Sequence, residues 1–75
     1  MLKDNRRFPR AALMAQAGQL ESRVQEWLDI TNQRIEECED SGMGSVAARF
    51  AARFNNLDEA RRAINEARVF LYNCH

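Results

Sequence analysis

The chain has one clear break, the segment Ser41-Gly42-Met43-Gly44-Ser45, which holds two of its three glycines. Glycine permits the left-handed backbone conformation that ends a helix, and Ser45 can cap a helix that follows. So few glycines and a single proline leave little room for the many turns of an all-β protein. The sequence therefore predicts an all-α fold, an antiparallel two-helix hairpin with its loop over residues 41–45.

The first half repeats apolar residues at helical spacing. Pro9 suits the first turn of a helix, and the steps of three and four residues beyond it approach the 3.5-residue period of a coiled coil. We therefore expect a helix over 9–40, preceded by a basic tail over 1–8. The stripe expected to face the second helix consists of Leu13, Ala17, Leu20, Val24, Trp27, Thr31, Ile35 and Cys38.

The second half carries a seven-residue repeat and predicts a helix over 46–73. Its large members are Phe50, Leu57, Ile64 and Leu71, with Ala60, Ala67 and Cys74 as companions and Arg53 as the exception. Large residues alternating with alanine favour close packing of two helices. Asn56 followed by Glu59 also fits a capping box, which would break the helix at Asn55-Asn56. Because the repeat runs through this point, we expect one continuous helix.

The repeat AARFAARF at 47–54 has a structural explanation in this hairpin. Folding at the loop places Ile35 opposite Phe50, and the two phenylalanines of the repeat then cover the closed end. Its arginines, Arg49 and Arg53, come near the acidic run at 36–40, with Glu36 opposite Arg49. That run lies at a helix C-terminus, where the helix dipole disfavours anions, so nearby cations are useful.

Composition and residue placement argue against catalysis and metal binding. The only histidine is the last residue, His75, and no serine, cysteine or lysine has an evident base beside it. Cys38 and Cys74 would lie at opposite ends of the hairpin, too far apart within one chain for a disulfide or a shared metal ion, and only an antiparallel dimer could bring them together. We therefore expect no enzyme activity, no cofactor and no small-molecule substrate.

The same reasoning bears on location. The apolar stretch that ends at Gln16 is shorter than the core of an export signal, and no run is long enough to cross a membrane. We expect an unprocessed cytoplasmic protein with reduced thiols, of bacterial or phage origin.

Surplus apolar surface is the most informative functional feature. The run at 69–72 is apolar around most of the helix, yet only Leu71 is needed between the two helices, and the residues around Trp27 likewise span more than one face. Exposed apolar patches mark association sites, and aromatic residues are common interface anchors. The predicted partner-binding residues are Trp27, Ile30, Val69, Phe70 and Tyr72. The partner is a second copy, giving a homodimeric four-helix bundle, or a different protein.

An alternative function is nucleic-acid binding. The equal numbers of basic and acidic residues, 11 each, give no net charge and neither favour nor exclude a local basic patch. The best candidates for contacts with nucleic acid or an acidic partner are Lys3, Arg6, Arg7 and Arg10, with the arginines of the second helix.

In shape, the expected hairpin resembles Rop-type dimers, in which two helical hairpins form a four-helix bundle. It is also similar in shape to the small hairpin co-chaperones of type III secretion needles, which partner helical-repeat chaperones. Neither likeness rests on matched residues, and no site residues follow from it. What the shape implies is a binding role, as an adaptor, inhibitor, co-chaperone or regulator.

Overall fold

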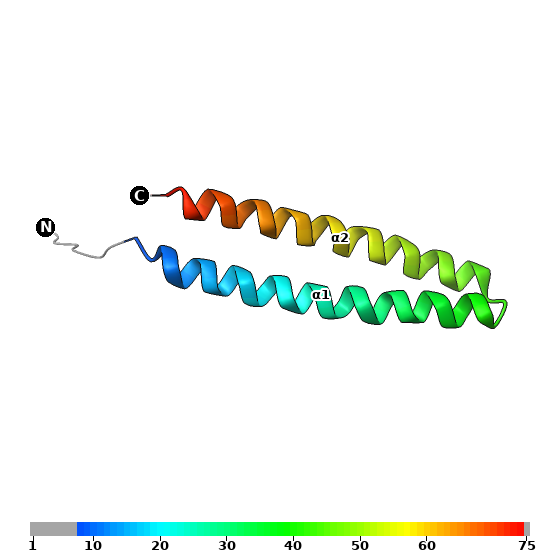
Figure 1. Ribbon diagram of the computed structural model, residues 1–75. Helices are drawn as coiled ribbons and strands as arrows, with labels where there is room; N and C mark the ends of the chain where they lie inside the picture. The colour runs from blue at the N-terminus through cyan, green and yellow to red at the C-terminus, as the bar shows by residue number, and fades with distance from the viewer. Residues whose placement is uncertain (1–7, 75) are drawn as a thin grey trace, which may run out of the picture.

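Two long helices lie antiparallel and are joined by a tight turn (Figure 1). The computed structural model describes residues 8–74, with α1 at Arg10–Asp40 and α2 at Gly44–Tyr72. The predicted all-α hairpin is confirmed. The basic tail predicted at 1–8 lies outside the described residues except for Phe8.

The turn is shorter than the five residues that the sequence predicted. The Gly42 N–H donates to the carbonyl of Glu39, and the Met43 N–H donates to the carbonyl of Cys38 at 2.8 Å. This pair of bonds is a Schellman motif, and Gly42 supplies the left-handed residue it needs, with φ of 74°. The motif leaves the chain ready to begin α2 at Gly44, so Ser45 lies inside the first turn and the predicted Ser45 cap is wrong.

The end of α1 at Asp40 is as predicted, and the start of α1 and the end of α2 each differ from the predicted position by one residue. Pro9 precedes α1 as its N-cap instead of occupying the first turn, and α2 ends at Tyr72 instead of residue 73. The helix α2 continues through Asn55-Asn56 without a break, as predicted. Phe54 and Leu57, on either side of this point, are both partly buried, so the packing on α1 is uninterrupted.

The seam between the helices follows alternating steps of three and four residues. On α1, the partly or fully buried residues at these steps are Arg10, Met14, Ala17, Glu21, Val24, Leu28, Thr31, Ile35 and Cys38. On α2 they are Ala47, Phe50, Phe54, Leu57, Arg61, Ile64, Arg68 and Leu71. The predicted series of large residues on α2 is therefore confirmed.

Part of the predicted α1 stripe is wrong by one position. Leu20 and Trp27 are 53% and 55% exposed, while their neighbours Glu21 and Leu28 face α2. The physical reason is visible at Glu21, whose carboxylate accepts a hydrogen bond from the Arg68 guanidinium of α2. An ion pair thus occupies a seam level that an apolar pattern assigns to leucine.

Two of the three companion positions predicted on α2, Ala60 and Ala67, are wrong, while the third, Cys74, is partly buried. Arg53, Ala60 and Ala67 are exposed, and the next residues along the chain, Phe54, Arg61 and Arg68, line the seam instead. Arginine can serve there because its aliphatic stem packs on apolar neighbours while its guanidinium reaches solvent or a carboxylate.

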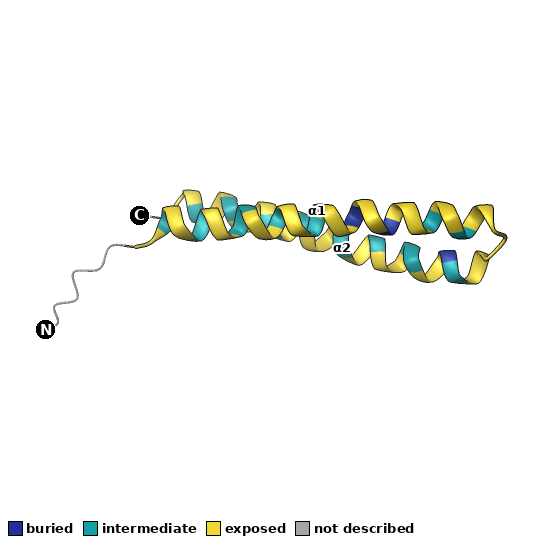
Figure 2. Cartoon of the chain, turned by 90° about the horizontal axis from the view of Figure 1, so that it is seen from below, coloured by how far each residue is buried: buried dark blue, intermediate teal, exposed yellow. Residues whose placement is uncertain are grey.

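Burial is concentrated near the turn. Among residues 8–74, only Leu28, Thr31 and Ala47 are buried, and Figure 2 shows all three on the side of the loop. We call residues 28–57 the loop half and residues 10–27 with 58–74 the open half. The seam of the open half contains no buried residue, so two helices alone do not make a core there.

At the open end of the hairpin, Arg10 of α1 contacts the last residues of α2. Its guanidinium donates to the carbonyl oxygens of Tyr72 at 2.8 Å and Cys74 at 3.0 Å, and it lies 5.9 Å from the centre of the Tyr72 ring. The last turn of α2 has no basic residue of its own. Arg10 therefore supplies, from the neighbouring helix, the cation that stabilises a helix C-terminus.

The repeat at 47–54 is only partly explained by the predicted charge pairing. Phe50 and Phe54 are partly buried at the closed end, as predicted. Within residues 8–74, however, no ion pair joins Arg49 or Arg53 to Glu36 or Glu37. The Arg53 guanidinium instead lies over the Phe50 ring, 5.3 Å from its centre.

The Arg10→Ala substitution should loosen the end of α2. Loss of hydrogen bonds from a charged donor at a partly exposed site should lower the free energy of unfolding by about 1 kcal/mol. Amide hydrogen exchange should accelerate at 70–74 but not near the turn. Arg23→Ala removes the same side chain from an exposed position of α1 and should change neither quantity. Equal effects from the two substitutions would contradict the conclusion that Arg10 stabilises the end of α2.

Candidate protein-binding face

Each helix carries two flanking rows of residues, one on either side of the seam. On one side α1 contributes Leu13, Leu20, Trp27 and Arg34, and α2 contributes Val46, Arg53, Ala60, Ala67 and Cys74. On the other side α1 contributes Ala11, Gly18, Gln25, Asn32 and Glu39, and α2 contributes Ala51, Asp58, Asn65 and Tyr72. Because corresponding rows meet in an antiparallel pair, the hairpin has one mostly apolar side and one mostly polar side.

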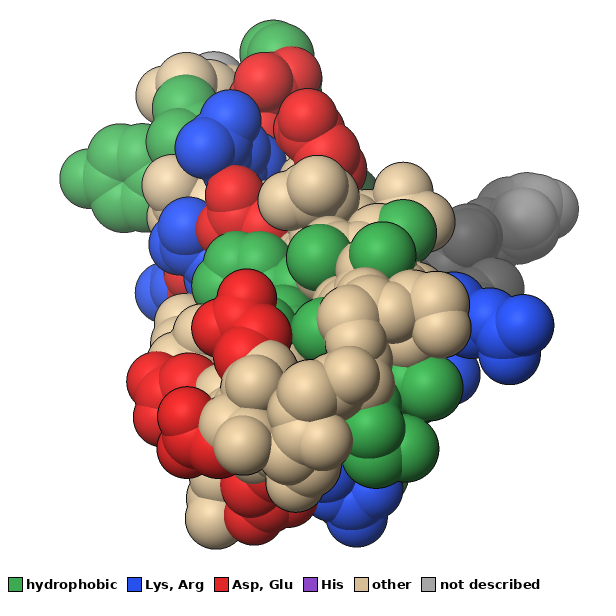
Figure 3. Space-filling model, turned by 90° about the vertical axis from the view of Figure 1, so that its right-hand side faces the viewer, with side chains coloured by type: hydrophobic (Ala, Val, Ile, Leu, Met, Phe, Trp, Pro, Cys, Tyr) green, Lys and Arg blue, Asp and Glu red, His purple; other side chains and the backbone are tan. Residues whose placement is uncertain are grey.

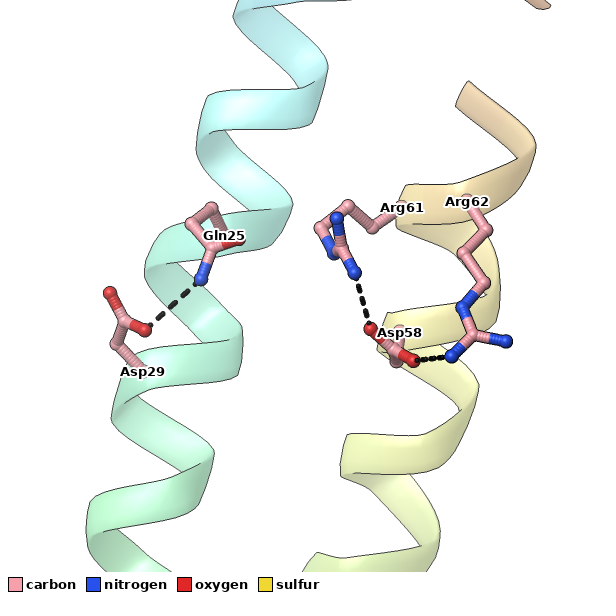
Figure 4. Close-up of polar contacts among 5 residues, drawn as sticks. All are labelled: Gln25, Asp29, Asp58, Arg61 and Arg62. Atoms are coloured by element: carbon pink, nitrogen blue, oxygen red, sulfur yellow. Dashed lines mark hydrogen bonds and ion pairs between the residues drawn. The ribbon is translucent and has the colours of Figure 1, made fainter. Parts of the chain in front are cut away.

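The polar side holds a shallow groove across the two helices. It is lined by Gln25, Leu28, Asp29, Asn32, Phe54, Asp58 and Arg61. Its polar groups satisfy one another within each helix (Figure 4), since the Gln25 amide donates to Asp29 at 3.1 Å. A self-satisfied groove of this kind offers little unused hydrogen-bonding capacity to a ligand.

The carboxyl group of Asp58 in this groove has a lowered pKa. It accepts a hydrogen bond from Arg61 at 2.9 Å and forms an ion pair with Arg62 at 3.1 Å (Figure 4). The hydrogen bond from Arg61 is the main cause that lowers the Asp58 pKa, partial desolvation opposes it, and the positive charge of Arg62 adds to the lowering. These contacts stabilise one turn of α2 and do not form a catalytic pair.

The apolar side presents apolar residues along the open half and, at Ile30, just inside the loop half. We define the apolar face by its members, which are Leu13, Leu20, Trp27, Ile30, Ala60, Ala63, Ala67, Phe70 and Cys74. Ile30 lies one helical turn from Trp27, and Phe70 lies one turn from Ala67, so both extend the flanking rows outward. Phe70 is 65% exposed and Ile30 is 39% exposed. Toward the loop this surface ends at arginines, and a view onto the loop end shows hydrophobic groups at the surface among charged ones (Figure 3).

The five predicted binding residues are all exposed, but the structure does not bring them together on one surface. Trp27, Ile30 and Phe70 lie on the apolar face. Val69 and Tyr72 lie on the polar side, where they line a shallow groove together with Met14, Asn65, Arg68 and Asn73. The Tyr72 ring is also in contact with Arg10, so it contributes to closing the hairpin itself.

Sequence reasoning missed part of the apolar face because it placed those residues in the seam. Leu20, Ala60 and Ala67 were assigned to the contact between α1 and α2 and were therefore not offered as binding residues. No apolar neighbour marks these three residues, because Glu21, Arg61 and Arg68 follow them in the sequence. The one signal is Leu28 after Trp27, since two adjacent apolar residues cannot both face one narrow seam and the choice of Leu28 shifts the α1 stripe by one position.

The basic residues predicted to contact nucleic acid or an acidic partner differ in how the structure places them. Lys3, Arg6 and Arg7 lie outside the described residues, and Arg10 is engaged with the end of α2. Three α2 arginines, at 61, 62 and 68, form ion pairs with carboxylates of the hairpin. Fewer guanidinium groups are therefore open to phosphate than the sequence alone indicates.

Other kinds of site find little support in the part of the chain that the structure describes. Within residues 8–74, no three side chains of types that ligate metals lie close enough to hold an ion. Cys38 and Cys74 are both free and partly buried. Neither α1 nor α2 has the length and hydropathy needed to cross a bilayer.

No protein family, curated protein or solved structure matches this chain. The residues and geometry of the hairpin are therefore the basis for inferring its function.

The structure predicts an unequal effect of the two arginines on Asp58. Arg61→Gln should move the Asp58 pKa back toward about 3.9, the usual value for aspartate, by more than Arg62→Gln does. A carboxyl with a lowered pKa stabilises the fold above its unfolded-state pKa, and this contribution is lost as pH falls through the lower folded-state value. Carboxyl NMR titration of the parent and both variants measures the shift, and a larger change in Arg62→Gln would contradict the assigned cause.

Proposed function

We propose that this chain is a non-enzymatic protein–protein interaction module that binds through its apolar face. It would act as a small adaptor, inhibitor, co-chaperone or regulator. The observation that carries the proposal is a coincidence of two features, since the apolar face flanks the same open half of the seam that has no buried residue. One covering layer would therefore complete the core and hide the exposed apolar groups together.

The energetics support association through this face. Burial of apolar surface contributes roughly 25 cal/mol per Å², and a large side chain that is half exposed has much of that contribution still to gain. Trp27 and Phe70 are 55% and 65% exposed. Aromatic residues in such positions are typical anchors, and the small alanines beside them allow a partner helix to approach closely.

The proposed mode of binding is helix packing. Rows of residues seven apart on α1 and α2 match the apolar stripe of a partner helix laid along the hairpin. A cytoplasmic setting, in which Cys38 and Cys74 stay reduced, is part of the proposal.

Nucleic-acid binding is the weaker alternative. It would use cations, and those of residues 8–74 that the sequence favoured are largely engaged, as with Arg10 at the end of α2 and Arg68 with Glu21. Titration with RNA or DNA at two salt concentrations separates the alternatives, since contacts with phosphate weaken steeply as salt rises.

The two sides of the hairpin provide a matched test of the proposed function. When the double variant Trp27→Ala, Phe70→Ala is immobilised, it should capture at least about tenfold less partner protein than the immobilised parent does. The reason is that the two substitutions remove the anchors of the apolar face. The double variant Val69→Ala, Tyr72→Ala removes comparable apolar area from the opposite side and should retain nearly as much as the parent. Retention of added copies of the chain and of host proteins is quantified by mass spectrometry, with circular dichroism as the check on helix content. Equal losses in both variants would refute the role of the apolar face.

A further inference from the structure

We propose that the partner on the apolar face is a second copy of this chain, seated over the open half with its loop at the opposite end. This inference rests on the proposed function and specifies its partner. It rests on four observations, which are the missing core, the self-matching rows, the placement of the arginines and the area available.

The lack of buried residues in the seam of the open half favours a partner that is present whenever the chain folds. Among residues 8–74 only Leu28, Thr31 and Ala47 are buried, and none of the three lies in the open half. Chains of this size commonly complete their core by oligomerising. A second copy is the partner that is always synthesised at a matching concentration, whereas an unrelated protein has to be supplied separately.

The flanking rows match themselves about a two-fold axis at the level of Leu20 and Ala67. Rotation about this axis places α1 against α1 and α2 against α2, both antiparallel. Leu20 then meets Leu20 of the second copy, and Leu13 meets Trp27. On α2, Ala67 meets Ala67 and Ala60 meets Cys74. Every level of the flanking rows within the overlap therefore pairs apolar with apolar, as an isologous interface requires.

The arginines decide the direction of the second copy. Arg34 on α1 and Arg53 on α2 are the next members of the flanking rows toward the loop. With both loops at the same end, these residues from two copies would place four guanidinium groups in one interior layer, where unpaired charges are costly. With loops at opposite ends and the axis at Leu20, Arg34 lies beyond the start of α1 of the second copy and Arg53 lies beyond the end of its α2, so both fall outside the overlap of the helices.

The overlap is large enough for a specific interface. It runs from about residue 10 to about residue 30 of α1, which is roughly 30 Å at 1.5 Å per residue, and two helices side by side are roughly 20 Å wide. This gives about 600 Å² on each copy and about 1,200 Å² in total. Specific protein interfaces begin at about this size.

Paired cysteine variants test both the partner and its direction. In a background of Cys38→Ser and Cys74→Ser, the variants Ala67→Cys and Ala60→Cys each place one exposed thiol on the same row of α2, seven residues apart. Two copies of residue 67 face each other at the axis, while two copies of residue 60 are about 21 Å apart along the helices. Because a disulfide needs Cβ atoms about 4 Å apart, Ala67→Cys should form a linked dimer at least tenfold faster.

The readouts are the oligomeric state of the parent by sedimentation equilibrium and the rate of disulfide formation on non-reducing gels under mild oxidation. A dimer that cross-links selectively through residue 67 supports the proposal. Equal cross-linking rates at residues 60 and 67, or a parent that stays monomeric at about 1 mM, overturn it. If the parent is monomeric but the variant Trp27→Ala, Phe70→Ala still loses a captured protein, only the second-copy proposal fails. If capture is also unaffected by that variant, the proposed function fails as well.

Discussion

Two helices packed along one seam can each hide only a narrow stripe, and the rest of this molecule depends on that limit. The described residues include three buried side chains, Leu28, Thr31 and Ala47, and all of them lie in the loop half. The apolar residues beside the seam cannot be buried within the hairpin. Their exposure is therefore a consequence of the fold, and the proposed binding role is argued from the architecture more than from any single motif.

The turn and the polar residues of the seam act together on the register of the two helices. Only three residues join Asp40 to Gly44, so sliding one helix past the other by a seven-residue repeat would unwind a helix end beside the turn. The pair of Glu21 with Arg68 and the bonds from Arg10 to the end of α2 are made in the register that this turn sets. Partly exposed ion pairs contribute about 1 kcal/mol or less each, so they reinforce that alignment modestly.

The sequence predicted the hairpin, the turn at Gly42 and the series from Phe50 to Leu71 because these depend on local backbone preferences and strong periodicity. It failed at the one-residue choice between Trp27 and Leu28, and between Ala67 and Arg68. Trp27 and Leu28 both fit an apolar pattern, whereas that pattern prefers Ala67 to the charged Arg68, and the cross-helix contact of Arg68 with Glu21 reverses the preference. Consequently Trp27, Ile30 and Phe70 of the apolar face could be named from the sequence as candidates, while Leu20 and the alanines of the same face could not.

The two halves of the hairpin differ in what holds them together. The loop half has the short connection between the helices and the three buried residues found within 8–74. The open half has its ends tied by Arg10 but no buried seam residue to hold it between that point and Leu28. In the proposed dimer the second copy covers this open half and leaves the loop half uncovered. Association and completion of the core would then be a single event, and the arginines near the turn would stay exposed in the assembled protein.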